Sequence, residues 1–345
     1  MGEGRVMSRQ GSVVSSGEPR GTDRPFVSAV FPNFNGGSFL TTVIDALLHQ
    51  QYPRDRFEIL MVDNGSTDGS VALVKTTFSE AIAQDRLKIF ELPENRGCSA
   101  GYNYGIARMS PQARYLLRVD DDLVLDANCL AHLVRRAEQE PSVGAVGGKV
   151  RYYQDRQRLH LIGSRISPWF GACRGIGKHV IDRGQYDTPR ELQAVNGCLM
   201  LVRRDVFERI GPIEESFFLY FEDIDWALRA TRAGFRHYYV PEALAYHDTA
   251  TPSQRYCSTR WGYFNICNTC YLAKRNFTKT NQVICWGVLS VKMLCYLPFV
   301  LFYSRWRSPI VLRSMWLGYR RGTALLFGSN GASTVHHPLH EVLNG

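Results

Sequence analysis

Short apolar runs alternate with longer helical patterns over the first 140 residues, and this alternation constrains the fold more than any other feature. We expect strands at residues 26–31, 57–62, 87–92 and 115–119, and helices at 39–49, 70–78, 100–109 and 130–139. Strict alternation implies right-handed crossovers and a parallel sheet that is buried on both faces. The sequence therefore predicts an α/β fold with a mostly parallel central sheet and helices on both faces.

The chain after residue 150 is less regular. Residues 163–184 contain five glycines, which favours a long loop or lid. A helix with acidic residues at its start is expected within residues 217–234, followed by two strands at 236–240 and 243–246. The chain has nine cysteines, an odd number, and no secretory signal precedes them. This combination predicts reduced thiols.

Composition divides the chain into four segments. Residues 1–24 are rich in Gly, Ser and Arg and predict a disordered tail. Residues 25–250 carry the alternating pattern and form the expected α/β domain. Residues 251–330 are basic and apolar, and we expect a helical segment that associates with a membrane. Residues 331–345 are a second tail.

Polar side chains follow the predicted strands at their carboxyl ends, where open parallel sheets bind ligands. They are Asn33 to Asn35, Asp63, and Asp120 to Asp122. No G-x-G-x-x-G motif follows the first strand, so a dinucleotide-binding fold is disfavoured.

The three adjacent carboxylates at 120–122 are the strongest local signal. They repel one another unless a cation lies among them. Residues 120 and 122 point the same way from an extended chain, so two carboxylates can converge on one ion. Oxygen ligands beside a strand end suit Mg²⁺ or Mn²⁺, which also bind diphosphates. A solvated acidic turn is the alternative interpretation.

A second acidic group lies among bulky aromatic residues at 217–229. It comprises Glu222, Asp223 and Asp225. Carboxylates at a helix start are stabilised by the helix dipole, which is one sufficient explanation. Apolar surroundings also raise the basicity of a carboxylate, as proton removal from a hydroxyl requires.

Six segments, in order, resemble the large glycosyltransferase family 2, whose members have the GT-A fold. They are VSAVFPNFNG (27–36), MVDNGSTDGS (61–70), ENRGCSAGYN (94–103), DDD (120–122), FEDIDW (221–226) and YVPEALAYH (239–247). The resemblance extends from Pro25 to Phe277, and more weakly to Phe327. Within the family, the chain looks most like bacterial rhamnosyl- and galactofuranosyltransferases that build cell-surface polysaccharide.

The resemblance implies an inverting transfer of a hexosyl or deoxyhexosyl group from a nucleotide-diphosphate-sugar, UDP- or dTDP-linked, to an acceptor hydroxyl. It implies a donor pocket formed by Pro32, Asn33, Asn35, Asp63, Arg96 and Asp120. It also implies a divalent metal on Asp120 and Asp122, with His247 completing the site, and Asp223 as the general base. Asn196, Glu222, Asp225 and Trp226 are the candidates for contact with the acceptor.

Several of these residues have a structural alternative. Asp63 begins an Asp-Asn-Gly-Ser sequence that is typical of turns, Arg96 precedes an expected helix, and His247 ends an expected strand. The segment at Asn196 departs from the small Ser-Gly-Ala type that relatives commonly carry, which leaves the sugar open.

The net charge of +9 is concentrated in the last quarter of the chain. Residues 249–340 contain no Asp or Glu and eleven of the 41 Lys and Arg residues. Within this stretch, residues 283–303 are apolar apart from Lys292 and suffice in length for a span of roughly 20 residues. Basic residues flank both ends, however, and both ends then favour the cytoplasm. We therefore expect peripheral attachment to an anionic membrane at its cytoplasmic face, with a span or packing on the protein as alternatives.

A polyprenyl-linked or other glycan acceptor fits such an attachment, and no nucleic-acid partner is expected, because an apolar run suits lipid better. A sugar-nucleotide pyrophosphorylase is one rival, but it needs a Gly-rich basic loop where residues 32–36 read Pro-Asn-Phe-Asn-Gly. A non-catalytic glycan-binding relative is the other, although the Asp triplet and Asp223 are both present.

Overall fold

The computed structural model of the chain describes residues 24–169, 172–248, 259–303 and 308–328. The expected tails at 1–24 and 331–345 lie outside these ranges, apart from Arg24.

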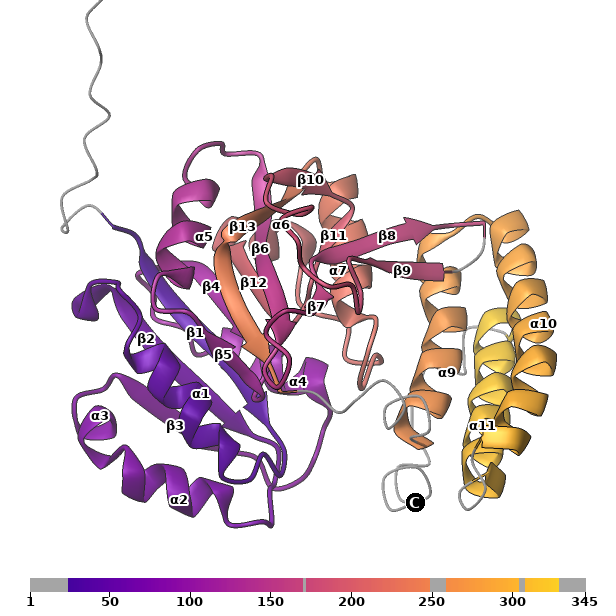
Figure 1. Cartoon of the computed structure of the whole chain (residues 1–345), viewed down its shortest axis with the longest axis horizontal. Coiled ribbons are helices and arrows are strands. Elements are labelled where there is room, and N and C mark those ends of the chain that lie inside the picture. The colour runs from indigo at the N-terminus through magenta and orange to yellow at the C-terminus, as the bar shows by residue number, and fades with distance from the viewer. Residues whose placement is uncertain (1–23, 170–171, 249–258, 304–307, 329–345) are drawn as a thin grey trace, which may run out of the picture.

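The first half alternates strands and helices as predicted (Figure 1). Its strands are β1 (Phe26–Asn33), β2 (Phe57–Asp63), β3 (Leu87–Glu91), β4 (Ala113–Val119) and β5 (Leu123–Leu125). Its helices are α1 (Phe39–Leu48), η2 (Arg54–Arg56), α2 (Ser70–Thr77), α3 (Ser79–Ala83), α4 (Cys98–Ile106) and α5 (Cys129–Ala137).

The second half adds strands to the same sheet. These are β6 (Val143–Tyr152), β7 (Leu159–Leu161), β10 (Arg190–Leu192), β12 (Leu199–Arg203) and β13 (Arg236–His247). The order along the sheet is β10-β13-β6-β12-β4-β1-β2-β3. Strands β4, β1, β2 and β3 are parallel, and so are β13 and β6. Because β12 is antiparallel to both β4 and β6, the carboxyl ends of β1, β2, β4 and β13 lie at one edge.

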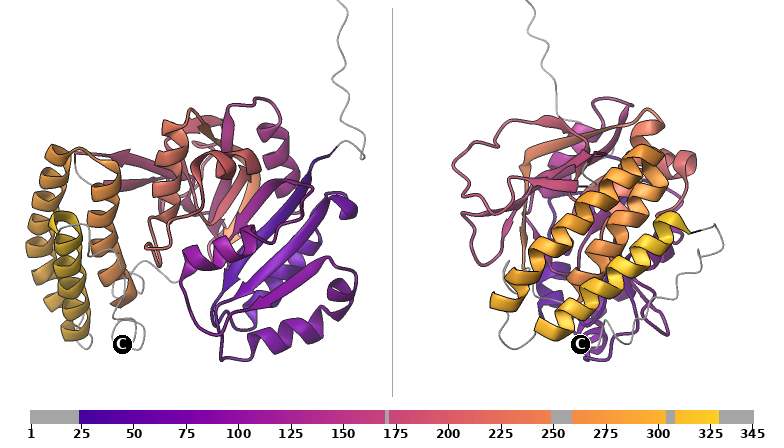
Figure 2. Two further views of the ribbon diagram at one scale, coloured as in Figure 1. Left: turned by 180° about the vertical axis from the view of Figure 1, so that it is seen from behind. Right: turned by 90° about the vertical axis from the view of Figure 1, so that its right-hand side faces the viewer.

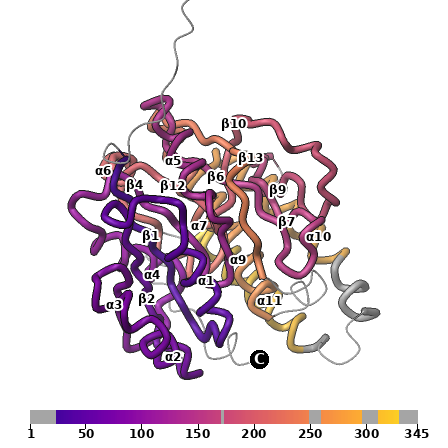
Figure 3. The backbone as a smooth tube through the Cα atoms, turned by 60° about the vertical axis from the view of Figure 1, so that its left-hand side comes forward, coloured from indigo at the N-terminus to yellow at the C-terminus, as the bar shows by residue number. Residues whose placement is uncertain are grey.

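Two sequence expectations in the second half are wrong. Residues 236–247 form one strand and not two, because a register shift between Val240 and Leu244 absorbs Pro241 as a bulge. In Figure 3 this strand, β13, runs past β6 as one continuous stretch of the tube. Residues 163–184 are not simply a loop, since β8 (Gly163–Ser167), β9 (Ala172–Ile176) and β11 (Ala194–Val195) form a separate three-stranded sheet.

The core lies on both faces of the central sheet, as predicted. On one face, α1 and α5 pack their apolar residues against the strands, with Leu40, Ile44 and Leu133 fully buried. On the other face, α4, α6 (Arg204–Ile210) and α7 (Glu222–Arg232) cover the sheet, and Trp226 is buried there. The apolar residues of β1 and β2, apart from the partly buried Phe26, are buried because both faces are covered.

Three helices complete the described chain: α9 (Thr259–Asn276), α10 (Lys279–Tyr303) and α11 (Ser308–Phe327). They lie side by side on one side of the α/β part (Figure 2). Cys267 and Cys270 are buried thiols in α9, as packing residues would be. Among the described residues, none of the helices is both long and apolar enough to cross a bilayer.

Candidate active site

The polar residues predicted at the strand ends do meet at one edge of the sheet. β1 ends at Asn33, β2 at Asp63 and β13 at His247, while Asp120 directly follows β4. These residues come from four strands that are separated by up to 214 positions in the sequence, and the parallel alignment brings them together. The edge therefore carries most of the candidate site.

Asp120, Asp122 and His247 form a cluster in which one ligand atom from each lies within 4.8 Å of the others. His247 Nε2 is 2.6 Å from Asp122 Oδ1 and 4.0 Å from Asp120 Oδ2. Tyr102 donates its hydroxyl to Asp120 Oδ1 at 2.9 Å and so fixes that carboxylate. Two carboxylates and one imidazole are ligands that suit Mn²⁺ or Mg²⁺.

Backbone pairing explains how a histidine from the far end of the domain reaches the Asp triplet. The chain turns after Asp122 into β5, which pairs antiparallel with the end of β13, so that Leu123 lies opposite His247. Asp248 N donates to Asp122 O at 2.9 Å and extends this pairing. The last residue of β13 is therefore held beside the last residue of the triplet.

The electrostatics of the triplet favour a bound cation. Burial raises the pKa of Asp120, and the negative charge of Asp122 adds to this effect. Burial, together with the charges of Asp122 and Asp120, raises the pKa of Asp121 to about 8. A divalent ion among these carboxylates would offset their mutual repulsion, so the residues present fit such an ion.

Asp63 joins the loops that follow β1 and β2 through hydrogen bonds. Its Oδ1 accepts hydrogen bonds from Asn33 Nδ2 at 2.7 Å and Ser66 Oγ at 2.6 Å, and its Oδ2 accepts from the backbone of Gly65 and Ser66. The carboxylate is buried, and its hydrogen bonds to Gly65 N and Ser66 N are those of a side chain that stabilises a turn. The structural alternative for Asp63 is therefore present. In this arrangement Asp63 fixes the conformation of the turn at residues 63–66.

The other residues predicted for the donor pocket lie at or after the strand ends and in the loop before α4. Asn35 has a φ of 56° and accepts a hydrogen bond from Thr67 N at 2.9 Å, which ties the two loops together. Pro32 is buried at the end of β1. Arg96 is half exposed in the loop before α4, with its guanidinium 3.7 Å from Glu215.

Asp223 is the second residue of α7 and is held by two backbone amides. Gly197 N donates to its Oδ2 at 3.2 Å, and Ile224 N donates to its Oδ1 at 2.8 Å. Burial raises the pKa of Asp223 to about 6, and the negative charge of Glu222 adds to the effect. A carboxylate with this pKa is ionised near neutral pH and accepts a proton more readily than an ordinary Asp.

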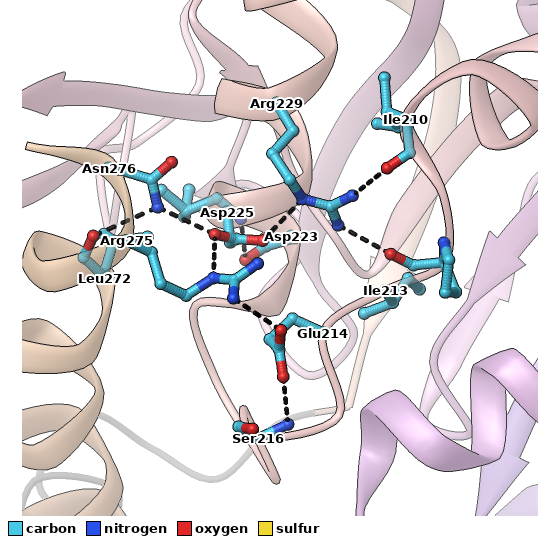
Figure 4. Close-up of polar contacts among 12 residues, drawn as sticks. Ile210, Ile213, Glu214, Ser216, Asp223, Asp225, Arg229, Leu272, Arg275 and Asn276 are labelled. Carbon is cyan, nitrogen blue, oxygen red and sulfur yellow. Dashed lines mark hydrogen bonds and ion pairs between the residues drawn. The ribbon is translucent and has the colours of Figure 1, made fainter. Parts of the chain in front are cut away.

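The other acidic candidates on α7 are occupied inside the protein. Glu222 forms a buried ion pair with Arg118, whose guanidinium stacks 4.1 Å above the Tyr102 ring. Asp225 is fully buried and accepts from Arg229 at 2.9 Å and from Arg275 at 3.0 Å (Figure 4).

Trp226 is buried as well, in the core beneath α7. Burial and ion pairing hold the side chains of Glu222, Asp225 and Trp226 inside the protein, and their contact with an acceptor stays a prediction. Asn196 is also buried, at 7% exposed, and its Nδ2 has no hydrogen-bond partner within the described chain, as is true of Glu222 Oε2 and Trp226 Nε1.

Residues 196–198 connect the two chemical parts of the site. Gly197 N binds Asp223, and Cys198 O accepts from Asp120 N at 3.2 Å. A Cβ atom on Gly197 would lie 2.6 Å from Asp223 Oδ2, so only glycine leaves room for this carboxylate. The sequence departure at this segment signalled a role, but sequence reasoning missed Gly197 itself.

Sequence reasoning also missed residues that shape the site from beneath. Tyr220 and Phe221, just before α7, have φ values of 70° and 73°. Asn268 in α9 donates to the carbonyls of Leu219 and Tyr220 at 2.8 and 3.0 Å, which holds this unusual turn. Two consecutive non-glycine residues with positive φ leave no signal in a sequence.

Comparison with known proteins agrees with this geometry. The model of "Glycosyl transferase family 2" matches residues 28–211, which is more than half of the chain. Glycosyltransferase AglE of Haloferax volcanii is 26% identical over 226 residues, covering 65% of this chain and 67% of that protein. N-acetylglucosaminyl-diphospho-decaprenol L-rhamnosyltransferase of Mycobacterium tuberculosis is 26% identical over 224 residues, covering 57% and 68%.

A solved structure has the same fold. The mannosyltransferase PcManGT of Pyrobaculum calidifontis, in complex with GDP-Man and Mn²⁺, superposes with a TM-score of 0.54 at 20% identity, covering 91% of this chain and 79% of that one. The predicted fold and the resemblance from sequence are thereby confirmed. With the Asp triplet at the carboxyl edge and a family match from residue 28 to residue 211, the chain belongs to glycosyltransferase family 2.

Proposed function

We propose that this glycosyltransferase moves a sugar, with inversion, from a nucleotide-diphosphate donor to a hydroxyl of a lipid-linked acceptor. The observation that carries the proposal is the placement of two chemical groups. The cluster of Asp120, Asp122 and His247 supplies ligands for a cation, and Asp223 supplies a base. Residues 197 and 198 connect the two through backbone hydrogen bonds.

Asp120, Asp122 and His247 would hold a divalent ion, Mn²⁺ or Mg²⁺. When bound, such an ion neutralises the charge that develops on the leaving diphosphate. Tyr102 keeps the Asp120 carboxylate in place, and the pairing of β5 with β13 keeps His247 in place. The protein therefore presents these ligands without a large rearrangement, which is the purpose of a preorganised site.

The donor nucleoside would lie against the loops that follow β1 and β2. Asn33, Asp63 and Ser66 hold these loops in one hydrogen-bonded unit, with Asn35 and Arg96 at its rim. The unpaired Nδ2 of Asn196 is a donor group for a sugar hydroxyl on the transferred or accepting residue.

Asp223 would act in a single displacement. Its carboxylate takes the proton of the acceptor hydroxyl as that oxygen forms a bond to the anomeric carbon. The bond from the same carbon to the diphosphate oxygen breaks on the opposite face, which inverts the configuration. Gly197 N and Ile224 N orient the carboxylate during this step.

The substitution Asp223→Asn tests this role. Turnover should fall by about 10²- to 10⁴-fold, the usual contribution of a general base. Donor affinity should stay unchanged, since the base contacts the acceptor. The measurement is release of nucleoside diphosphate from a panel of donors with Mn²⁺, and Asp205→Asn on the exposed start of α6 is the matched control. Turnover near that of the wild type in Asp223→Asn would refute the assignment.

Membrane attachment through α10 and α11 would bring a lipid-linked acceptor to the site. Val291 and Leu294 on α10 are 60% and 72% exposed and lie on one stripe of the helix, beside the exposed Lys292. On α11, exposed Trp316 lies between exposed Arg313 and Arg320. Apolar and aromatic residues next to cations match an anionic lipid surface.

The names of relatives support the acceptor class: the M. tuberculosis relative is named for a decaprenol-diphosphate-linked substrate.

Full-length protein should sediment with anionic phospholipid vesicles at low salt and be released at high salt, because each Lys or Arg near the surface contributes about 1 kcal/mol. The double substitution of Val291 and Leu294 by Glu should weaken sedimentation, and Leu73→Glu, on the exposed side of α2, should not. Wild-type protein that stays in the supernatant with anionic vesicles at low salt would contradict the attachment.

A further inference from the structure

Behind the carboxylate cluster lies a second set of potential ligands, of which only His247 also belongs to the carboxylate cluster. His160 on β7, Cys198 before β12 and His247 place one ligand atom each within 4.8 Å of the others, and all three are buried. Nitrogen and sulfur ligands differ in kind from the carboxylates of the neighbouring cluster, since they favour Zn²⁺ over Mg²⁺ or Mn²⁺.

The geometry of the two imidazoles suits a tetrahedral ion. His247 Nδ1 and His160 Nδ1 are 3.4 Å apart, and the rings are nearly perpendicular, at 89°. Two nitrogens bound to one tetrahedral Zn²⁺ at about 2.0–2.1 Å are separated by about 3.3–3.4 Å. The observed separation therefore needs almost no change for both nitrogens to bind one ion.

The ring of His160 is also held in place by its neighbours. Tyr152 packs edge-on against it, with ring centroids 5.3 Å apart, and the Tyr152 hydroxyl contacts His179 Nδ1. Cys198 is held through its backbone, because its amide donates to Asn196 Oδ1 at 3.3 Å and its carbonyl accepts from Asp120 N. The three ligands thus come from a supported part of the fold.

We propose that His160, Cys198 and His247 form a binding site for a thiophilic divalent ion such as Zn²⁺, which excludes the cation of the carboxylate cluster. Exclusion follows from the shared imidazole. A neutral His247 has one ring proton, so only one of its two nitrogens is available as a ligand.

When Nε2 binds the cation beside Asp122, the ring proton lies on Nδ1 and points to His160. When Zn²⁺ binds Nδ1, the proton lies on Nε2 and is donated to Asp122. Zn²⁺ binding also releases the Cys198 thiol proton to solvent as the Zn–S bond forms. The site would therefore make the enzyme sensitive to zinc, and this consequence for activity rests on the proposed function.

The binding itself is tested without any activity assay. Metal-free full-length protein is titrated with Co²⁺, which reports a thiolate ligand through an intense near-ultraviolet charge-transfer band. The wild type should show the band, and Zn²⁺ should abolish it by displacement. Cys198→Ser should lack the band, whereas Cys267→Ser, a buried thiol in α9, should keep it. His160→Gln should retain a thiolate ligand but bind Co²⁺ at least about tenfold more weakly.

A second measurement addresses exclusion. Free Mn²⁺ is followed by its electron paramagnetic resonance signal as it is added to protein with and without one equivalent of Zn²⁺. Zinc should weaken Mn²⁺ binding in the wild type and in Cys267→Ser, and much less in Cys198→Ser.

A wild-type protein without the cobalt band, or a band that Cys198→Ser retains, would overturn the site. Independent binding of Zn²⁺ and Mn²⁺ to the wild type would overturn the exclusion. A protein that shows the cobalt band but does not transfer sugar would leave the zinc site standing and refute only the proposed function.

Discussion

The substitution Gly197→Ala isolates the placement of Asp223 from its chemistry. The added Cβ would lie 2.6 Å from Asp223 Oδ2 and 2.8 Å from its Cβ, whereas ordinary contacts begin at 3.4 Å. The carboxylate must therefore retreat by about 0.8 Å, and its hydrogen bond from Gly197 N at 3.2 Å is strained. The backbone of Gly197 does not have a positive φ, so alanine introduces no conformational strain of its own.

The size of the effect follows from this displacement. A misplacement of about 1 Å in a catalytic group lowers the rate about 100-fold, so we expect Gly197→Ala to lower kcat by about 10- to 100-fold. KM for the donor should change little, because the donor loops are untouched. Overpacking should also lower the free energy of unfolding by about 1–3 kcal/mol.

The assay is steady-state transfer at saturating donor, with the Tm followed by circular dichroism. Gly287→Ala in α10 is the matched control, since a Cβ there meets nothing within 4 Å and its kcat should equal that of the wild type. A kcat for Gly197→Ala within threefold of the wild type, in a folded protein, would show that Asp223 is not held as described.

Three further predictions concern the same site. Transfer should fall about tenfold per pH unit below about 6, because protonation of Asp223 removes the base, and should level off above that pH; a pH–kcat profile checks this. Chelation should abolish transfer and Mn²⁺ or Mg²⁺ should restore it, because Asp120, Asp122 and His247 are arranged as ligands; full activity in excess chelator would contradict it. Asn268→Ala should lower the free energy of unfolding by about 1–3 kcal/mol and also lower kcat, because two hydrogen bonds to the turn before Asp223 are lost; chemical denaturation and steady-state kinetics measure both.

The hydrophobic pattern of the sequence predicted the longer elements in the first half of the domain, but not the short η2, α3 and β5. Each of the eight elements predicted there is present with ends that differ by at most two residues, except for the helix at 100–109, which ends three residues earlier, at Ile106. Local patterns succeed here because parallel strands buried on both faces are continuously apolar and their crossover helices are amphipathic. The Asp triplet was also evident, since its position depends only on the strand before it.

Burial of charged side chains could not be predicted from the same patterns. Glu222 and Asp223 are adjacent, yet one forms a buried ion pair with Arg118 and the other is held by backbone amides at the site. Arg118 lies 104 positions from Glu222 in the sequence, and both side chains are buried where they meet. Nothing local in the sequence distinguishes the two acids, because the difference is which partner the fold places opposite each.

The pairing of distant strands decided the rest. The sequence contained His160, Cys198 and His247 at wide intervals, and no spacing rule relates them. Their meeting depends on β7 pairing with β6, on β12 entering the sheet antiparallel, and on β13 ending beside β5. Sequence alone determined which residues end each strand; the order and direction of the strands, which long-range packing sets, determined which of those ends share a site.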